Sequence, residues 1–168
     1  MKVLSTPLKE QVITGLTIGE VVSISGYIFC GRDAVLPRIC KEIEDGTWEE
    51  RGIDLRGGAM FHTAVSPAGV GPTSSNKLEI ESSFETLSKA GIKLHLGKGA
   101  IKPETVKILT DNNSVFAIIP PVTALLESQT LERECVAFPE LGMEALYRIK
   151  VENYQAIIAA AKGVSIYE

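Results

Sequence analysis

The sequence is poor in the side chains that bind metals or cross-link small domains, with three cysteines and two histidines in 168 residues. Cys30, Cys40 and Cys135 are odd in number and widely spaced, so they match neither a disulfide framework nor a Cys-x-x-Cys metal or redox motif. His62 and His95 are isolated from each other and from pairs of acidic residues, which favours structural histidines over metal ligands. We therefore expect reduced cysteines and no metal site within this chain.

Long apolar runs, basic clusters and linkers are also missing. The longest apolar stretches, residues 156–161 and 115–122, are far shorter than the roughly 20 residues of a membrane span. The net charge is −4 without a cluster of Lys and Arg, which argues against a nucleic-acid partner. The amino terminus becomes polar too early for a secretion signal, and no Pro- or Ser-rich segment divides the chain. These absences predict one soluble, cytoplasmic domain over residues 1–168.

Strand and helix patterns alternate along the middle of the chain. β-Branched and aromatic residues predict a strand at residues 20–29, and helical spacing predicts a helix within residues 32–44. Because Pro37 is not tolerated in a helix interior, this helix begins near Leu36 or has an irregular first turn. The same reasoning predicts strands at residues 59–65, 92–96 and 115–119, and helices up to Gly91, at 103–109 and at 122–127. This alternation favours a layered α/β domain over a β-sandwich.

Toward the carboxyl end the pattern changes to strands. Residues 135–138, 147–151 and 156–160 have strand composition, and residues 140–146 are typical of a short helix. The last two strands are close enough for a hairpin around residues 152–154. Together with residues 14–19, this hairpin could form a terminal β layer.

The glycine-rich segment at residues 68–79 is the strongest candidate for chemistry. Gly69 and Gly71 let a ligand approach the main chain, and Pro72 fixes one dihedral ahead of the polar residues. Unpaired amides beside hydroxyls and a lysine suit an anion such as phosphate or carboxylate. The alternative is a helix N-terminus, where a hydroxyl caps free amides and Glu79 lies in the first turn. The two interpretations are compatible, and the side chains concerned are Thr73, Ser74, Ser75 and Lys77.

Two further cations follow predicted strands. Arg32 comes after the first of them, and Lys98 lies between two glycines at the end of another. Taken alone, Arg32 is a surface cation or a partner of Asp33, and Lys98 is a solvated turn lysine. Arg32 is also close enough in sequence to lower the pKa of the Cys30 thiol, although a small apolar residue filling a strand end is the simpler interpretation. Three acidic residues are interpreted as structural charges: Asp33, Glu140 and Glu144.

Four phrases of the sequence, taken in order, resemble a known family. They are Ser-Gly-Tyr-Ile-Phe leading into Gly-Arg-Asp-Ala at residues 25–34, Gly-Pro-Thr-Ser-Ser at 71–75, Gly-Lys-Gly at 97–99, and Ala-Phe-Pro-Glu-Leu-Gly-Met-Glu-Ala at 137–145. Together they resemble the β subunit of the iron-sulfur-dependent fumarate and tartrate hydro-lyases, the class I fumarases. The resemblance covers nearly the whole chain and implies a swivelling β/β/α layered domain with a mixed sheet.

The resemblance also implies a partner. In this family an α subunit holds a [4Fe-4S] cluster with one iron open to the substrate, and the β part closes over it. The cysteines of this chain lack the family's cluster-binding context, so the resemblance assigns the cluster to a missing α subunit. It further implies an α2β2-type assembly, with a homo-oligomer as the form of the isolated chain.

The resemblance assigns roles to individual residues. Thr73 stands at the position of the family's proposed catalytic base, and Arg32 and Lys98 stand at positions that bind the substrate carboxylates. Lys77 replaces an arginine that is common in the family, which keeps the positive charge but loses the planar bidentate fork. The same motif supplies two more substrate-binding candidates, Gly71 and Ser74. It also has Glu79 where an aspartate is common in the family.

These observations predict one half of an enzyme. The favoured reaction is the reversible hydration of fumarate to (S)-malate, in which three cations neutralise the carboxylates and Thr73 removes or returns the C3 proton. Tartrate dehydration is the second choice. A non-catalytic module that binds an anion at the glycine-rich segment is the alternative from another class. A self-sufficient hydratase is disfavoured, because the sequence shows no convincing metal set and no histidine dyad.

Overall fold

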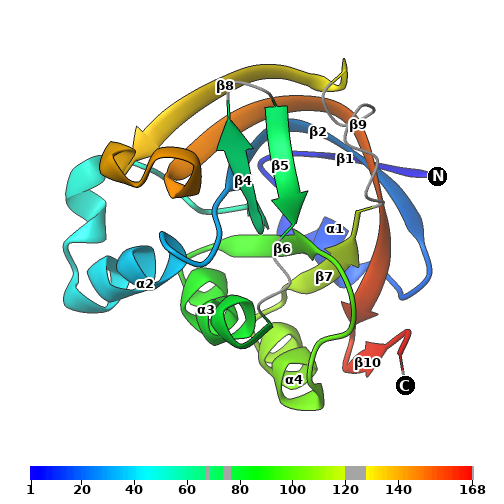
Figure 1. The fold of residues 1–168 in the computed structure, drawn as a ribbon. Helices are drawn as coiled ribbons and strands as arrows, with labels where there is room; N and C mark the ends of the chain where they lie inside the picture. The colour runs from blue at the N-terminus through cyan, green and yellow to red at the C-terminus, as the bar shows by residue number, and fades with distance from the viewer. Residues whose placement is uncertain (67–68, 74–76, 120–127, 168) are drawn as a thin grey trace.

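The computed structural model describes residues 1–66, 69–73, 77–119 and 128–167, and for residues 66, 69–73 and 77–80 it describes the backbone alone (Figure 1). The elements in chain order are β1 (Lys2–Ser5), α1 (Glu10–Thr14), β2 (Val21–Cys30), α2 (Leu36–Asp45), η1 (Trp48–Arg51), β3 (Gly58–Phe61), β4 (Thr63–Ser66), β5 (Gly69–Thr73), α3 (Lys77–Lys89), β6 (Ile92–Gly97), α4 (Pro103–Asp111), β7 (Val115–Ile118), β8 (Thr130–Ala137), η2 (Pro139–Glu144), β9 (Leu146–Ala161) and β10 (Val164–Ser165). No described helix is long and apolar enough to cross a membrane.

Most of the strands form one mixed sheet that closes on itself. β2, β3, β6 and β7 are neighbours in that order and run parallel. The long strand β9 pairs antiparallel with both β2 and β7, which closes a barrel-like ring of five strands. β1 extends the sheet beside β2, while β8 and β10 pair with β9. The fold is therefore mixed α/β, as the alternation in the sequence predicts.

Three helices cover one flank of this sheet. α2 packs on α3 and α3 packs on α4, and Figure 1 shows them in a row beside β6 and β7. The buried apolar side chains of the described residues form three clusters. One comes from the strands of the ring, one lies beneath α2 and α3, and one lies beneath α4, represented in turn by Ile24 and Leu94, by Leu36 and Leu87, and by Val106 and Phe116. These clusters hold in place the strands that precede the candidate site residues.

Most helices and strands predicted from local sequence patterns are confirmed. α2 begins at Leu36 with Pro37 in its first turn, and it ends at Gly46, whose φ of 79° is left-handed. The strand predicted at residues 59–65 is interrupted at His62, so it forms β3 and then β4. Five other predicted elements lie within a few residues of their expected bounds: β2, β6, α4, β7 and the short helix η2.

The prediction of a carboxyl-terminal hairpin is wrong, because β9 is continuous through residues 152–154. Asn153 has a left-handed backbone with φ of 57°, and its N–H donates to Ser25 Oγ at 3.0 Å. Tyr154 is fully buried within the ring. The strand therefore continues from β2 to β7 instead of turning back.

The prediction of a terminal β layer is also wrong for the residues that the structure describes. Residues 14–19 contain the end of α1 and a turn, in which Glu20 Oε1 accepts hydrogen bonds from Thr17 N–H at 2.7 Å and from Thr17 Oγ1 at 2.9 Å. The carboxyl-terminal strands join the main sheet instead, and the strand expected at residues 135–138 is the end of the longer β8. The helix predicted at residues 122–127 lies outside the described residues.

Gly91 joins α3 to β6 and offers a test of this packing. Its φ is +124°, and a Cβ added there would lie 2.5 Å from Arg56 Cα and 2.8 Å from Arg56 N. We expect Gly91→Ala to lower the free energy of unfolding by about 2 kcal/mol, measured by urea denaturation, because the backbone and the neighbour both oppose a side chain. Gly19→Ala is the control, since Gly19 has φ of +85° but no atom within 4 Å of the added Cβ. An equal loss in the control would contradict the steric argument.

Candidate functional site

Arg32 and Lys98 follow two strands whose carboxyl ends meet at the same end of the sheet. β3 lies between β2 and β6, and all three run parallel. Gly31 N–H donates to the last carbonyl of β3 at 3.0 Å, and His62 N–H donates to Leu96 O of β6 at 3.0 Å, so the three strand ends are tied together. Arg32 is half-buried and Lys98 is exposed. Both therefore lie at the edge formed by the carboxyl ends of parallel strands, where open sheets and closed barrels of α/β proteins commonly bind ligands.

The glycine-rich segment reaches this edge as a strand. β5 pairs antiparallel with β4 in a small two-stranded sheet, which Figure 1 shows projecting from the main sheet. The Cα of Thr73 is in register with Thr63, two residues beyond the end of β3. The Thr73 backbone thus pairs with the segment that continues from β3, the strand between those that lead to Arg32 and Lys98. Sequence composition does not predict this strand, because glycine and proline are depleted in sheets. In the structure, pairing with β4 provides hydrogen-bond partners for backbone N–H and C=O groups.

The rest of the motif falls at the start of α3. This helix begins at Lys77, so Thr73 and Ser74 precede it and Glu79 lies in its first turn. Gly71 is within β5. Ser74 and the side chains of Thr73 and Lys77 lie outside the described part of the structure. Helix capping and anion binding at this segment both stay predictions.

Arg32 contacts an acidic residue from a distant segment. Its Nε lies 3.1 Å from Glu144 Oε2, with the two side chains 25% and 29% exposed. The other oxygen, Glu144 Oε1, accepts a hydrogen bond from Ala34 N–H at 3.4 Å. Glu140, also in η2, pairs with Arg38 of α2 at 3.2 Å and is more exposed. Of the three acidic residues interpreted as structural charges, Glu144 thus contacts a candidate site residue.

The two histidines, expected to be isolated from each other, lie in contact in the core. His62 Nε2 is 3.3 Å from His95 Nδ1, and His95 Nε2 is 2.9 Å from Ser88 Oγ. Both rings are fully buried, and Phe84 stacks on His95 with ring centres 4.3 Å apart. Burial, with a smaller contribution from His62, lowers the pKa of His95 well below its usual value. The expectation of isolation is wrong because β3 and β6 are neighbours, and the position of each histidine in or beside a predicted strand is the signal that could have shown it.

The three cysteines lie on different elements. Cys30 is fully buried in β2, and burial raises the pKa of its thiol, so the hypothesis that Arg32 lowers this pKa is wrong. Burial also raises the pKa of Cys40 to about 11. Cys135 is exposed on β8. Within the described ranges, no group of three or more His, Cys, Asp or Glu side chains is placed to hold a metal ion.

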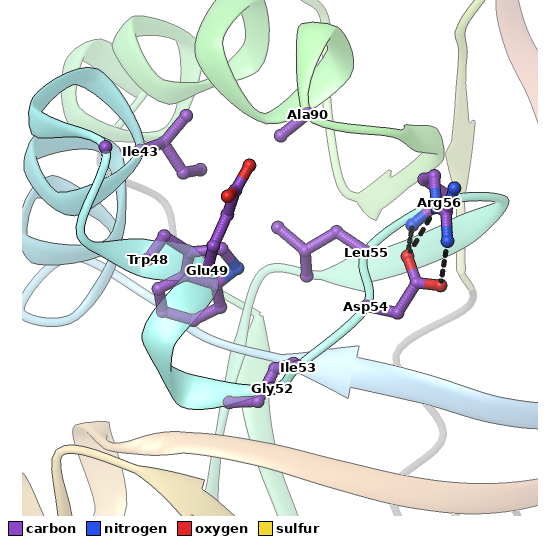
Figure 2. Close-up of a pocket in the computed structure, with 10 residues that line it drawn as sticks. Ile43, Trp48, Glu49, Gly52, Ile53, Asp54, Leu55, Arg56 and Ala90 are labelled. Atoms are coloured by element: carbon purple, nitrogen blue, oxygen red, sulfur yellow. Dashed lines mark hydrogen bonds and ion pairs between the residues drawn. The ribbon is translucent and has the colours of Figure 1, made fainter.

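A cavity of about 540 Å³ lies away from these strand ends (Figure 2). Leu55 and Arg56 line it and directly precede β3, so the cavity is at the opposite end of that strand from Thr63. Figure 2 shows the ion pair of Asp54 with Arg56 at one side of the cavity. The other lining residues come mainly from η1, from the ends of α2 and α3 and from the residues beside them: Ile43, Gly46, Trp48, Glu49, Gly52, Ile53 and Ala90. This cavity is not part of the candidate site.

Comparison with known proteins identifies the family. Residues 2–168 match the family model described as Fumarase C-terminus. The L(+)-tartrate dehydratase subunit beta of Escherichia coli strain K12 is 28% identical over 172 residues, which cover 95% of this chain and 82% of that protein. A Geobacillus stearothermophilus protein named "Putative fumarate hydratase class I" is 28% identical over 178 residues, which cover 98% of this chain and 33% of that protein. Because the family model spans nearly the whole chain, the resemblance is confirmed, and this chain belongs to the fumarase C-terminus family.

Proposed function

We propose that this chain is the β subunit of a two-subunit hydro-lyase that reversibly hydrates fumarate to (S)-malate. The proposal is carried by the strand-end edge shared by Arg32, Lys98 and the Thr73 backbone, in a chain that matches the fumarase C-terminus over residues 2–168. A dicarboxylate needs a cation for each of its carboxylates. This edge supplies cations from the ends of β2 and β6, the two strands that flank β3, and a third stands at the start of the helix that follows the glycine-rich segment.

The residues of this chain bind the substrate and move a proton. The carboxylates are bound at this edge by Arg32, Gly71, Ser74, Lys77 and Lys98. Thr73 removes or returns the C3 proton, a step that is difficult unless the developing negative charge is stabilised, which is the role of the cations. A threonine hydroxyl is a weak base, so a carboxylate from the partner subunit takes its proton onward.

The described residues do not fit an iron-sulfur cluster, because Cys30, Cys40 and Cys135 lie on β2, α2 and β8 and form no metal-binding group. We therefore assign the [4Fe-4S] cluster that the class I fumarase resemblance implies to an α subunit. The proposed assembly is of α2β2 type, with a homo-oligomer for the isolated chain. In this assembly residues 1–168 act as one swivelling β/β/α domain in the cytoplasm.

Tartrate dehydration is the second candidate reaction. It is favoured by the Escherichia coli relative, which is named a tartrate dehydratase subunit and matches 95% of this chain. Lys77 is compatible with tartrate as the substrate in place of fumarate. A lysine binds a carboxylate without the fixed bidentate geometry of the arginine that is common at this position.

Reconstitution tests the proposal. We expect no fumarate hydration by the chain alone, and malate formation when it is co-expressed with a cluster-bearing α subunit, followed as the loss of fumarate absorbance. Parallel assays with L(+)-tartrate decide between the two substrates. Turnover by the lone chain would contradict the two-subunit model. Dicarboxylate binding without turnover in the complex would favour a non-catalytic anion-binding module.

A further inference from the structure

We propose that Glu144 is a positioning residue that holds the guanidinium of Arg32 toward the strand-end site. This role rests on the proposed function, in which Arg32 binds a substrate carboxylate. The primary support is the 3.1 Å contact between Arg32 Nε and Glu144 Oε2. This contact is made at Nε, and the two terminal nitrogens of an arginine form a planar fork that suits a carboxylate.

The backbone around Arg32 is fixed, so the remaining freedom is in its side chain. Arg32 O accepts hydrogen bonds from Val35 N–H at 3.2 Å and from Leu36 N–H at 3.1 Å. At Gly31 an added Cβ would lie 2.9 Å from Val35 Cγ1, which shows how tightly this turn packs. An arginine side chain has large rotamer entropy, and ordering it before the substrate arrives lowers the cost of binding. The ion pair with Glu144 provides that order.

Glu144 is itself held in place at the end of η2. The next residue, Ala145, is buried, and its N–H donates to Gly142 O at 3.1 Å. The Tyr147 hydroxyl donates to the same carbonyl at 3.2 Å. Glu140 makes a second ion pair, between η2 and α2. The carboxylate of Glu144 therefore projects from an anchored segment and joins it to the turn between β2 and α2.

The contact depends on charge more than on a directed hydrogen bond. Arg32 Nε is a buried atom, and its N–H is not aligned with Glu144 Oε2 well enough for a hydrogen bond despite the short distance. A glutamine at position 144 would lose the attraction between charges. Its amide oxygen could still accept the hydrogen bond from Ala34 N–H. Glu144→Gln therefore removes the charge attraction to Arg32 and retains the contact with the backbone.

Kinetics of the complex with the α subunit test the role. We expect Glu144→Gln to raise KM for fumarate about tenfold and to change kcat less than about threefold, because a disordered cation weakens ground-state and transition-state binding alike. Glu140→Gln makes the same change on the more exposed acid of η2 and should leave both constants within about twofold of wild type. An unchanged KM would overturn the proposal. A lower KM would also overturn it, since Glu144 would then compete with the substrate for Arg32.

A second measurement does not depend on turnover. In the nitrogen-15-labelled chain, the NMR signal of Arg32 Nε–H, assigned with Arg32→Lys, should exchange with water about tenfold faster in Glu144→Gln than in wild type or Glu140→Gln, because local order protects N–H groups. Equal exchange in all three proteins would overturn the positioning role. Slow exchange that depends on Glu144, in a complex that does not hydrate fumarate, would support the contact and locate the failure in the proposed function.

Discussion

Replacing Thr73 with alanine is expected to lower kcat for fumarate hydration about 10²–10⁴-fold in the complex with the α subunit, the range typical of a lost general base. The backbone gives the reason, since Thr73 lies opposite Thr63, two residues beyond the end of β3, and β3 is flanked by the strands that lead to Arg32 and Lys98. In the proposed function, the cations hold the substrate carboxylates at this edge and Thr73 acts on the C3 proton. KM should change little, because alanine leaves those cations in place. Steady-state assays over a range of fumarate concentrations measure both constants.

Two variants separate proton transfer from packing. Thr73→Ser keeps the hydroxyl and should retain activity within about tenfold of wild type. Thr86→Ala removes a hydroxyl on α3 that donates to Glu44 Oε1 at 3.3 Å, away from the strand ends, and should leave kcat unchanged. Equal losses in Thr73→Ser and Thr73→Ala would indicate a packing role, and full activity of Thr73→Ala would remove Thr73 from the mechanism.

Elements governed by local rules could be predicted from the sequence, and those that depend on distant partners could not. Pro37 determines where α2 starts, because proline is tolerated only in the first turn, and Gly46 ends the helix. The polar residues 152–154 indicate a turn when taken alone. In the structure, pairing with β2 and the burial of Tyr154 keep β9 extended through them. These stabilising contacts come from segments far away in the chain.

The candidate site also has features that the local sequence predicts and features that depend on distant segments. The sequence motifs mark Arg32, Thr73 and Lys98, but only the parallel order of β2, β3 and β6 places their backbones at one edge. Glu144 is interpreted as a structural charge because no local pattern links it to Arg32. His62 and the other histidine are separated by a helix in the sequence, and the register of β3 with β6 brings them together. The proposed site thus depends on the order of the strands in the sheet, which composition does not reveal.

Acidification is expected to destabilise the protein through the buried His95. Burial and the neighbouring His62 hold the pKa of His95 well below 6.5 in the folded state, whereas the unfolded chain titrates near that ordinary value. The unfolded chain then binds more protons, so the free energy of unfolding falls as the pH decreases below about 6.5, by up to about 1.4 kcal/mol per pH unit. The loss continues until the pH reaches the lowered pKa of the folded state. Urea denaturation at intervals from about pH 7.5 to about pH 4.5 measures the slope.

The amino-acid composition and one variant distinguish the protonation of His95 from other causes of acid destabilisation. Side chains other than histidine ordinarily titrate outside the range from about pH 7 to pH 5, so we assign a pH dependence of stability in that range to the buried His95. Asp54, whose pKa Arg56 lowers to about 2, loses its contribution only at lower pH. His95→Gln does not titrate but can still hydrogen-bond to His62 and Ser88, so its stability should vary less with pH than that of wild type. An equal slope in both proteins would mean that His95 is not the group whose protonation opposes folding.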